Sequence, residues 1–197
     1  MEIRRATDGD RPQLAETLAR AFADDPVVTW LATPKAYARG GTRTFAAALK
    51  TTYLPKAEVY SAGEGKGVVI WVPPDKWKAP ATDSLRLLPA YRAMCGRRLP
   101  RVLKLVTAME KRHATIDEPH WYIPFIATDP AAQGKGLGSA LLEHVLEKAD
   151  AEGRPAYLEA TSPRNKLLYH RHGFVPMGDE LRVADSPPLT PMWRTPR

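Results

Sequence analysis

The stretch from residue 121 to residue 142 reads WYIPFIATDPAAQGKGLGSALL, and it predicts a strand, a glycine-rich loop and a helix in that order. Apolar and aromatic residues fill 121–127, and apolar residues recur at helical spacing from Leu137 onward. The three alternating glycines of 134–138 let the backbone approach a ligand closely, and the first N–H groups of a helix attract an anion. Because Lys135 lies among these glycines, the stretch predicts a site for phosphate or pyrophosphate.

The spacing of the glycines limits which phosphate compounds fit. The pattern G-x-G-x-G differs from the G-x-G-x-x-G of dinucleotide-binding folds, and the G-x-x-x-x-G-K-[ST] pattern of nucleotide hydrolases is absent. Nucleotide hydrolysis therefore has no support. A tight turn that binds no ligand is the alternative interpretation, since glycine patterns alone are weak evidence.

Strands and helices alternate on both sides of this stretch. The patterns predict a strand at Glu2–Ala6, helices from about Asp8 and at Lys35–Tyr53, a hairpin of Glu58–Ser61 with Gly67–Val72, a strand at Ala156–Ala160, a short helix at Pro163–His170, and strands at Phe174–Pro176 and Pro191–Arg194. A hairpin followed by strand–helix–strand units favours a mixed α/β sheet. No linker rich in Gly or Ser divides the chain, so we expect one domain over residues 1–197.

Composition excludes several classes of protein. The chain has 197 residues, 44% of them apolar, which suits one globular domain. Its longest apolar runs, such as Val68–Val72, are far too short to span a membrane, and the N-terminus has no apolar signal core. We therefore expect a cytoplasmic protein with no membrane partner. Cys95 is the single cysteine and the histidines show no ligand spacing, so we expect no metal.

The formal net charge of +7 lies entirely in one segment. Between Arg86 and Arg112 there are eight basic residues and one acidic residue, and the rest of the chain is balanced. The segment reads as two helices, and Arg101, Lys104, Lys111 and Arg112 fall opposite the apolar stripe of the second. A solvated polar face is one interpretation, and a surface that attracts an anionic ligand is the other. No groove-reading motif accompanies the charge, so we expect no nucleic-acid partner.

The residues around the glycine loop resemble the GCN5-related N-acetyltransferase (GNAT) superfamily. Its pattern, Q/R-x-x-G-x-G/A after a strand, is matched by Gln133, Gly136 and Gly138. A second signature, LEATSPRN at 158–165 followed by Tyr169, resembles the region where the superfamily places an Asn on the cofactor and a Tyr near its sulfur. Residues 21–24 and 69–71 extend the similarity toward acetyltransferases that modify aminonucleoside antibiotics.

This resemblance implies both a fold and an activity. The fold is a GNAT-type mixed, mostly antiparallel central sheet flanked by helices, with the basic helical pair inserted before the fourth strand. The activity is transfer of an acetyl group from acetyl-CoA to the free amine of a small molecule, such as an aminonucleoside antibiotic, by direct attack in a ternary complex. Such an activity would give antibiotic resistance. We expect the enzyme to act as a monomer or homodimer.

By resemblance, acetyl-CoA binds along the first strand and the glycine loop. The backbone of Ile126–Thr128 would pair with the pantetheine arm where the strand bulges near Pro124. An ordinary edge strand is the alternative explanation of that proline. The residues expected to bind the cofactor are Ile126, Ala127, Thr128, Gln133, Gly134, Lys135, Gly136, Leu137, Gly138, Ser139 and Asn165.

Two residues are the expected acid and base of the reaction. A tyrosine has an intrinsic pKa of about 10, so Tyr169 carries a proton at neutral pH that it can donate to the departing thiolate. Asn165 lies four residues upstream, on the same helix face. Glu159 is the expected base, acting directly or through water. The alternatives are a tyrosine that only fills a groove and a glutamate that is only structural.

Four residues are candidates for binding the acceptor. Asp24 and Asp25 lie where the first helices of the family line the acceptor pocket, so they could attract a cationic amine. Trp30 and Trp71 could stack on a flat substrate. Ordinary loop positions for the two aspartates and core positions for the two tryptophans are the alternatives.

Two other functions compete with this interpretation. An acetyltransferase for a peptide or protein amine predicts an open groove. An acyl-CoA-binding regulatory module without turnover predicts no release of coenzyme A when amines are added.

Overall fold

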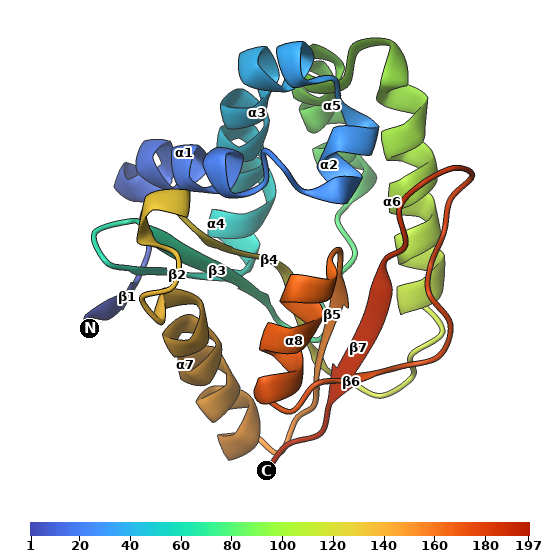
Figure 1. Cartoon of the computed structure of the whole chain (residues 1–197). Helices are drawn as coiled ribbons and strands as arrows, with labels where there is room; N and C mark the ends of the chain where they lie inside the picture. Colours follow the sequence, from blue (N-terminus) through green and yellow to red (C-terminus); the bar gives the residue numbers. More distant parts are fainter.

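Seven strands form one mixed sheet in the computed structural model, which describes all residues from 1 to 197 (Figure 1). The strands are β1 (Ile3–Arg5), β2 (Glu58–Ala62), β3 (Gly67–Val72), β4 (Trp121–Thr128), β5 (Ala156–Ala160), β6 (Val175–Pro176) and β7 (Thr190–Arg194). Their order is β1-β2-β3-β4-β5-β7-β6, and only the β4–β5 pair is parallel. The predicted mixed, mostly antiparallel sheet is confirmed.

Helices cover both faces of the sheet. They are α1 (Arg11–Ala21), α2 (Pro26–Leu31), α3 (Pro34–Ala48), α4 (Leu54–Lys56), α5 (Ala81–Cys95), α6 (Leu99–His113), α7 (Leu137–Ala151) and α8 (Pro163–Arg171). Figure 1 shows α1 to α6 on one side of the sheet and α7 with α8 on the other. The basic helices α5 and α6 precede β4, which confirms the predicted insertion before the fourth strand.

The strand β3 is buried on both faces because each face contacts a different core. Val68 and Ile70 belong to the core under α1 and α3, whereas Val69 and Trp71 belong to the core under α7. This arrangement explains the continuous apolar run of the strand. It also corrects one prediction: Trp71 is fully buried and stacks on Trp121 with ring centroids 4.8 Å apart, so it is a core residue and does not reach an acceptor.

The helix α2 was not predicted, because six residues are too few to show helical periodicity. It begins where Asp25 accepts hydrogen bonds from the backbone N–H groups of Val27 and Val28, at 2.9 and 3.1 Å, with Pro26 in the first helical position. The predicted helix at Lys35–Tyr53 is α3 followed by one turn of π-helix at Leu49–Tyr53.

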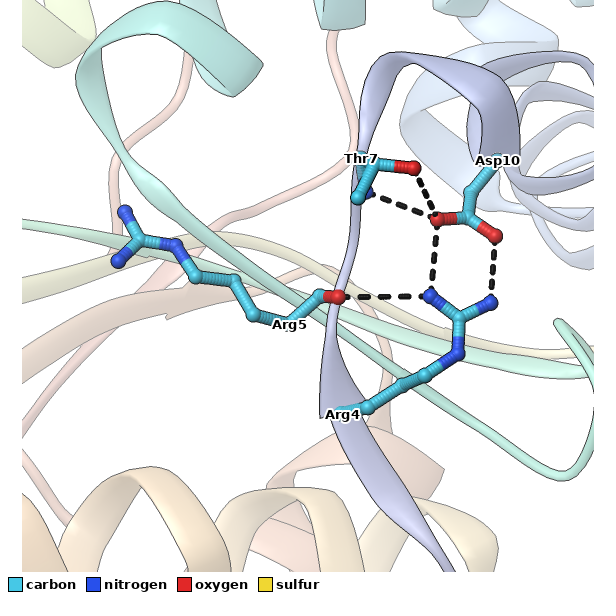
Figure 2. Close-up of polar contacts among 4 residues, drawn as sticks. All are labelled: Arg4, Arg5, Thr7 and Asp10. Carbon is cyan, nitrogen blue, oxygen red and sulfur yellow. Dashed lines mark hydrogen bonds and ion pairs between the residues drawn. The ribbon is translucent and has the colours of Figure 1, made fainter.

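A polar cluster joins β1 to the start of α1 (Figure 2). The guanidinium of Arg4 donates to both carboxylate oxygens of Asp10, at 2.9 and 2.5 Å. The backbone N–H and the hydroxyl of Thr7 donate to the same carboxylate, at 2.8 and 2.9 Å. These bonds, the one from Arg4 above all, hold the pKa of Asp10 well below its ordinary value. The cluster fixes the edge strand beside α1.

The parallel strands β4 and β5 pair only at their first two residues and then separate. Residues 121–122 pair with 156–157, after which β4 continues to residue 128 and β5 to residue 160 without further pairing (Figure 1). We call this gap, bounded by 123–128 and 158–160, the β4–β5 opening. Backbone groups of β4 that face the opening have no strand partner there, so they are available to a ligand.

A bulge in β4 accompanies the separation. The partner of Ile70 on β3 is Phe125, but the partner of Val72 is Tyr122, so β4 has one extra residue over this interval. Pro124 lies within it, and β4 is an interior strand of the sheet. Pro124 therefore occupies a bulge and not an edge strand, which was the alternative interpretation.

Candidate active site

The loop between β4 and α7 is held in place by Asp129. Its carboxylate accepts a hydrogen bond from the backbone N–H of Ala131 at 2.9 Å and forms an ion pair with Arg20 at 2.7 Å. Its own backbone N–H donates to the carbonyl of Lys66 at 2.7 Å. Asp129 is 8% exposed. The loop is therefore attached to α1 and to the β2–β3 hairpin before the glycines begin.

The glycines shape an open helix N-terminus. Gly134 and Gly136 have φ of +78° and +80°, values that only glycine adopts at low cost. No side chain caps α7, and the first turn holds no acidic residue, so its leading N–H groups are free to bind an anion. Lys135 is exposed beside them. The arrangement suits a phosphate group.

Gly138 has no steric reason to be glycine within the protein. A Cβ there would lie 3.6 Å from Oγ1 of Thr128 and 3.7 Å from Cδ2 of Leu168, which are ordinary contacts. A glycine inside a helix costs about 0.5–1 kcal/mol relative to alanine. The absence of a side chain at this point leaves room for a ligand to reach the backbone between α7 and α8.

Other residues predicted to bind the cofactor differ in which of their groups are free. The side chain of Leu137 is buried in the core, so only its backbone can contact a ligand. The hydroxyl of Ser139 is hydrogen-bonded to Nε2 of His172 at 3.1 Å. Gln133 is exposed, and its Nε2 donates to the carbonyl of Thr128 at 3.4 Å.

Asn165 lies one turn before Tyr169 in α8. Ser162 caps this helix by accepting from the backbone N–H of Asn165 at 3.2 Å. Tyr169 is 7% exposed and its ring lies edge-on to Phe174. Burial raises the pKa of Tyr169, and the negative charge of Asp25 raises it further, so its phenol stays protonated throughout the neutral range.

Glu159 is a partly buried carboxylate on β5. Its Oε2 accepts a hydrogen bond from the hydroxyl of Tyr122 at 3.0 Å. Burial raises the pKa of Glu159 to about 7, although the hydrogen bond from Tyr122 and the nearby hydroxyl of Tyr157 oppose that rise. A carboxylate with a pKa near neutrality can accept a proton and release it again, which suits a general base.

The two aspartates predicted to bind the acceptor have different surroundings. Asp25, besides capping α2, accepts a hydrogen bond from the hydroxyl of Thr161 at 2.5 Å, and it influences the pKa of Tyr169. It thus links the end of α1 to the residue that follows β5, beside the opening. Asp24 is exposed. The structure brings Asp25, Thr161 and Tyr169 together but does not bring Asp24 into this group.

Trp30 is occupied by protein contacts. It is 9% exposed, its Nε1 donates to Asp185 at 3.1 Å, and the guanidinium of Arg101 lies 5.0 Å from its ring centroid. This packing favours the alternative, a core position, for Trp30.

An aromatic cluster near the bulge was missed from the sequence. The rings of Phe22, Phe45 and Tyr53 surround Phe125 of β4, with centroids 5.5–5.8 Å from it. Phe22, Tyr53 and Phe125 are only partly buried. The nearness of Phe125 to Pro124 in the interrupted strand was the available signal.

Three arginines of the basic segment, which spans residues 86–112, donate hydrogen bonds to backbone carbonyls of other parts of the protein. Arg98 and Arg101 donate to the carbonyl of Trp30, at 3.4 and 2.8 Å, and Arg112 donates to the carbonyl of Met177 at 2.6 Å. A fully solvated face is therefore wrong for Arg101 and Arg112. Lys104 and Lys111 are exposed, in agreement with that interpretation.

One surface pocket lies next to the glycine loop and not at Tyr169 or Glu159. It has a volume of about 850 Å³ and is lined by residues of β1, α1 and the β2–β3 hairpin, with Lys135 at one side. None of the helices has the length and apolar character needed to cross a membrane. No group of three or more His, Cys, Asp or Glu side chains is arranged to hold a metal ion.

Comparisons with known proteins agree on one family. The model of the acetyltransferase (GNAT) family matches residues 84–174. An uncharacterized N-acetyltransferase of Schizosaccharomyces pombe is 26% identical over 186 residues, which are 89% of this chain and 74% of that protein. A crystal structure of "histone acetyltransferase HPA2 and related acetyltransferase" from Corynebacterium glutamicum is 30% identical, with a TM-score of 0.70, over 99% of this chain and 96% of that one. A polyamine N-acetyltransferase of Drosophila melanogaster shares 19% identity and a TM-score of 0.63, over 98% and 97%.

Proposed function

Since this chain belongs to the acetyltransferase (GNAT) family and is an acetyl-CoA-dependent N-acetyltransferase, we propose that residues 1–197 form one domain that acetylates the free amine of a small molecule. The observation that carries the proposal is the β4–β5 opening, where the glycine loop follows one strand and Glu159 lies on the other. A cosubstrate held along it has its phosphates at one end and its reactive group at the other.

The cofactor-binding part of the proposal uses backbone groups. The N–H groups at the start of α7 hold the pyrophosphate, with Lys135 adding a positive charge. The unpaired edge of Ile126–Thr128 adds the pantetheine arm as a strand, and Asn165 contacts it from α8. The open glycines and the uncapped helix fit this group. When bound, acetyl-CoA supplies the thioester that the amine attacks.

The catalytic part of the proposal assigns one proton to each of two residues. Glu159 accepts the proton of the ammonium, so that the neutral nitrogen attacks the thioester carbonyl carbon. The carbon–sulfur bond then breaks, the nitrogen releases its second proton to solvent, and the sulfur takes the phenolic proton of Tyr169, which solvent replaces. The pKa of Glu159, raised by burial to about 7, and the raised pKa of Tyr169 support these roles. Asp25 contributes the negative charge that attracts the amine.

The acceptor we propose is an aminonucleoside such as puromycin. The partly buried ring cluster of Phe22, Tyr53 and Phe125 supports a flat, aromatic substrate, and the sequence resemblance to puromycin N-acetyltransferases motivates the choice. The polyamine activity named for the Drosophila relative supplies a competing class of acceptor.

A panel of amines tests the proposal. We expect mass spectrometry to show the gain of one acetyl group on puromycin, with an equal amount of coenzyme A released, when both are incubated with the protein. If only polyamines are acetylated, the proposed acceptor is wrong, but the proposed acetylation of a small-molecule amine stands. Acetylation of peptides alone, with every small amine unchanged, would contradict the proposed class of substrate.

A further inference from the structure

Three buried polar atoms near Glu159 have no hydrogen-bond partner within the chain. They are Oε1 of Glu159, the hydroxyl of Tyr157 and Nε of Arg112. Buried polar atoms are nearly always hydrogen-bonded, because an unpaired one has lost its water without compensation. Three such atoms in one region therefore need a common explanation.

Tyr157 lies between the other two residues. It is two residues before Glu159 on β5, so their side chains are on the same face of the sheet. Arg112 is near the end of α6, where the ring of the next residue, His113, lies 5.0 Å from the ring of Tyr157. Burial raises the pKa of Tyr157, Glu159 raises it further and Arg112 lowers it, so the phenol is close to both charges.

The three atoms form a matched series of donors and acceptors. The Nε–H of Arg112 can only donate, the carboxylate of Glu159 can only accept, and the hydroxyl of Tyr157 can do both. A second hydrogen bond holds the guanidinium of Arg112 in place, since its Nη2 donates to the carbonyl of Met177 at 2.6 Å. Gly178 leaves room for it, because a Cβ there would lie 2.4 Å from that same nitrogen.

We propose that Arg112 and Tyr157 are positioning residues for Glu159, through a chain in which Arg112 Nε–H donates to the Tyr157 hydroxyl and that hydroxyl donates to Glu159 Oε1. Small side-chain rotations close the two bonds. Because Tyr122 already donates to Oε2, both carboxylate oxygens are then held. This inference rests on the proposed role of Glu159 as the base. Donation to a carboxylate stabilises its charged form, so the chain lowers a pKa that burial raises.

The other titratable side chains around this hydrogen-bond series, those of Tyr122, His113 and His120, do not change protonation at the pH where Glu159 does. Tyr122 keeps a strongly raised pKa, chiefly through burial. His113 and His120 form a buried pair with their Nε2 atoms 2.7 Å apart. Burial lowers the pKa of His113 to about 3 and lowers that of His120, so both rings stay neutral as Glu159 titrates.

The test measures the pKa of Glu159 directly. Protein labelled with ¹³C-glutamate is titrated by NMR, and the Glu159 carboxyl signal is the one missing from Glu159→Gln. Tyr157→Phe keeps the ring and removes the hydroxyl, and we expect it to raise the midpoint by about one pH unit. Arg112→Met is expected to raise the midpoint of Glu159 by less, and Arg112→Lys is expected to return it part of the way to the wild-type value. Lys111→Met, on the exposed face of α6, is the matched control and leaves the midpoint unchanged.

The double variant shows whether Arg112 acts on the pKa of Glu159 through the Tyr157 hydroxyl or only through its charge. Because Arg112 acts through Tyr157, Arg112→Met adds no shift in the Tyr157→Phe background. An unchanged midpoint in Tyr157→Phe, or an equal shift in Lys111→Met, would overturn the inference. The failure of the proposed base has a different signature, which is a Glu159→Gln variant that turns over normally while the NMR shifts appear as expected.

Discussion

Replacing Tyr169 with phenylalanine is expected to lower kcat by about 100-fold or more, because general acid catalysis typically contributes about 10²–10⁴-fold. The change removes only the hydroxyl, so the ring keeps its edge-on contact with Phe174. The raised pKa of Tyr169 means that the wild-type phenol is protonated at every pH at which the enzyme works. Steady-state kinetics with puromycin and acetyl-CoA measures the loss.

The expected loss is confined to chemistry. The affinity for acetyl-CoA should stay within about two-fold, since the cofactor contacts we propose are backbone groups of β4 and α7 together with Lys135 and Asn165, and not the hydroxyl of Tyr169. Tyr60→Phe is the matched control, because Tyr60 donates its hydroxyl to Glu58 on β2, away from the opening. An unchanged kcat in Tyr169→Phe removes this residue from the acid role.

Replacing Glu159 with glutamine is expected to lower kcat/KM by about 100-fold or more and to abolish one limb of the pH profile. Burial raises the pKa of Glu159 to about 7, so wild-type activity rises as the pH increases through that value and the carboxylate forms. The amide cannot accept a proton, so the variant lacks this rise. The measurement is kcat/KM from about pH 5.5 to pH 9.

Two controls separate the carboxylate from other causes of the pH dependence. The amine acceptor itself titrates, so the experiment uses two acceptors whose amines differ in pKa. If the midpoint of the rise in kcat/KM shifts with the pKa of the acceptor, the rise does not come from Glu159. Folding is the second control. A carboxyl group with a raised pKa stabilises the fold most at low pH and loses that contribution as the pH rises through about 7. Glu159→Gln should therefore lose no stability at pH 8.

The sequence predicted the parts of the fold that depend on local signals. Strand, glycine loop and α7 were found because apolar periodicity and the glycine pattern lie within one continuous stretch. The grouping of Asn165 and Tyr169 on one helix followed from a spacing of four residues. The bulge at Pro124 was expected from the resemblance, and the register confirms it.

Residues whose surroundings come from distant segments were beyond such reasoning. Trp71 was a candidate for stacking on the acceptor, with a core position as the alternative, but the sheet has helices on both faces, so neither side of β3 is exposed. Arg112 lies opposite the apolar stripe of α6, yet Met177 and Tyr157 cover it there. Helical periodicity identifies the side of a helix but not what a later loop places against that side.

The central claim is that acetyl-CoA is bound by the backbone at the start of α7, and Gly138→Ala tests it most directly. The added methyl group fits without a clash inside the protein, and alanine favours a helix. The thermal unfolding temperature should therefore be unchanged or slightly higher. Titration calorimetry should nevertheless show acetyl-CoA binding weakened by about 10-fold or more, because the methyl group occupies the approach to the N–H groups. Full affinity in a stably folded Gly138→Ala protein would contradict the account.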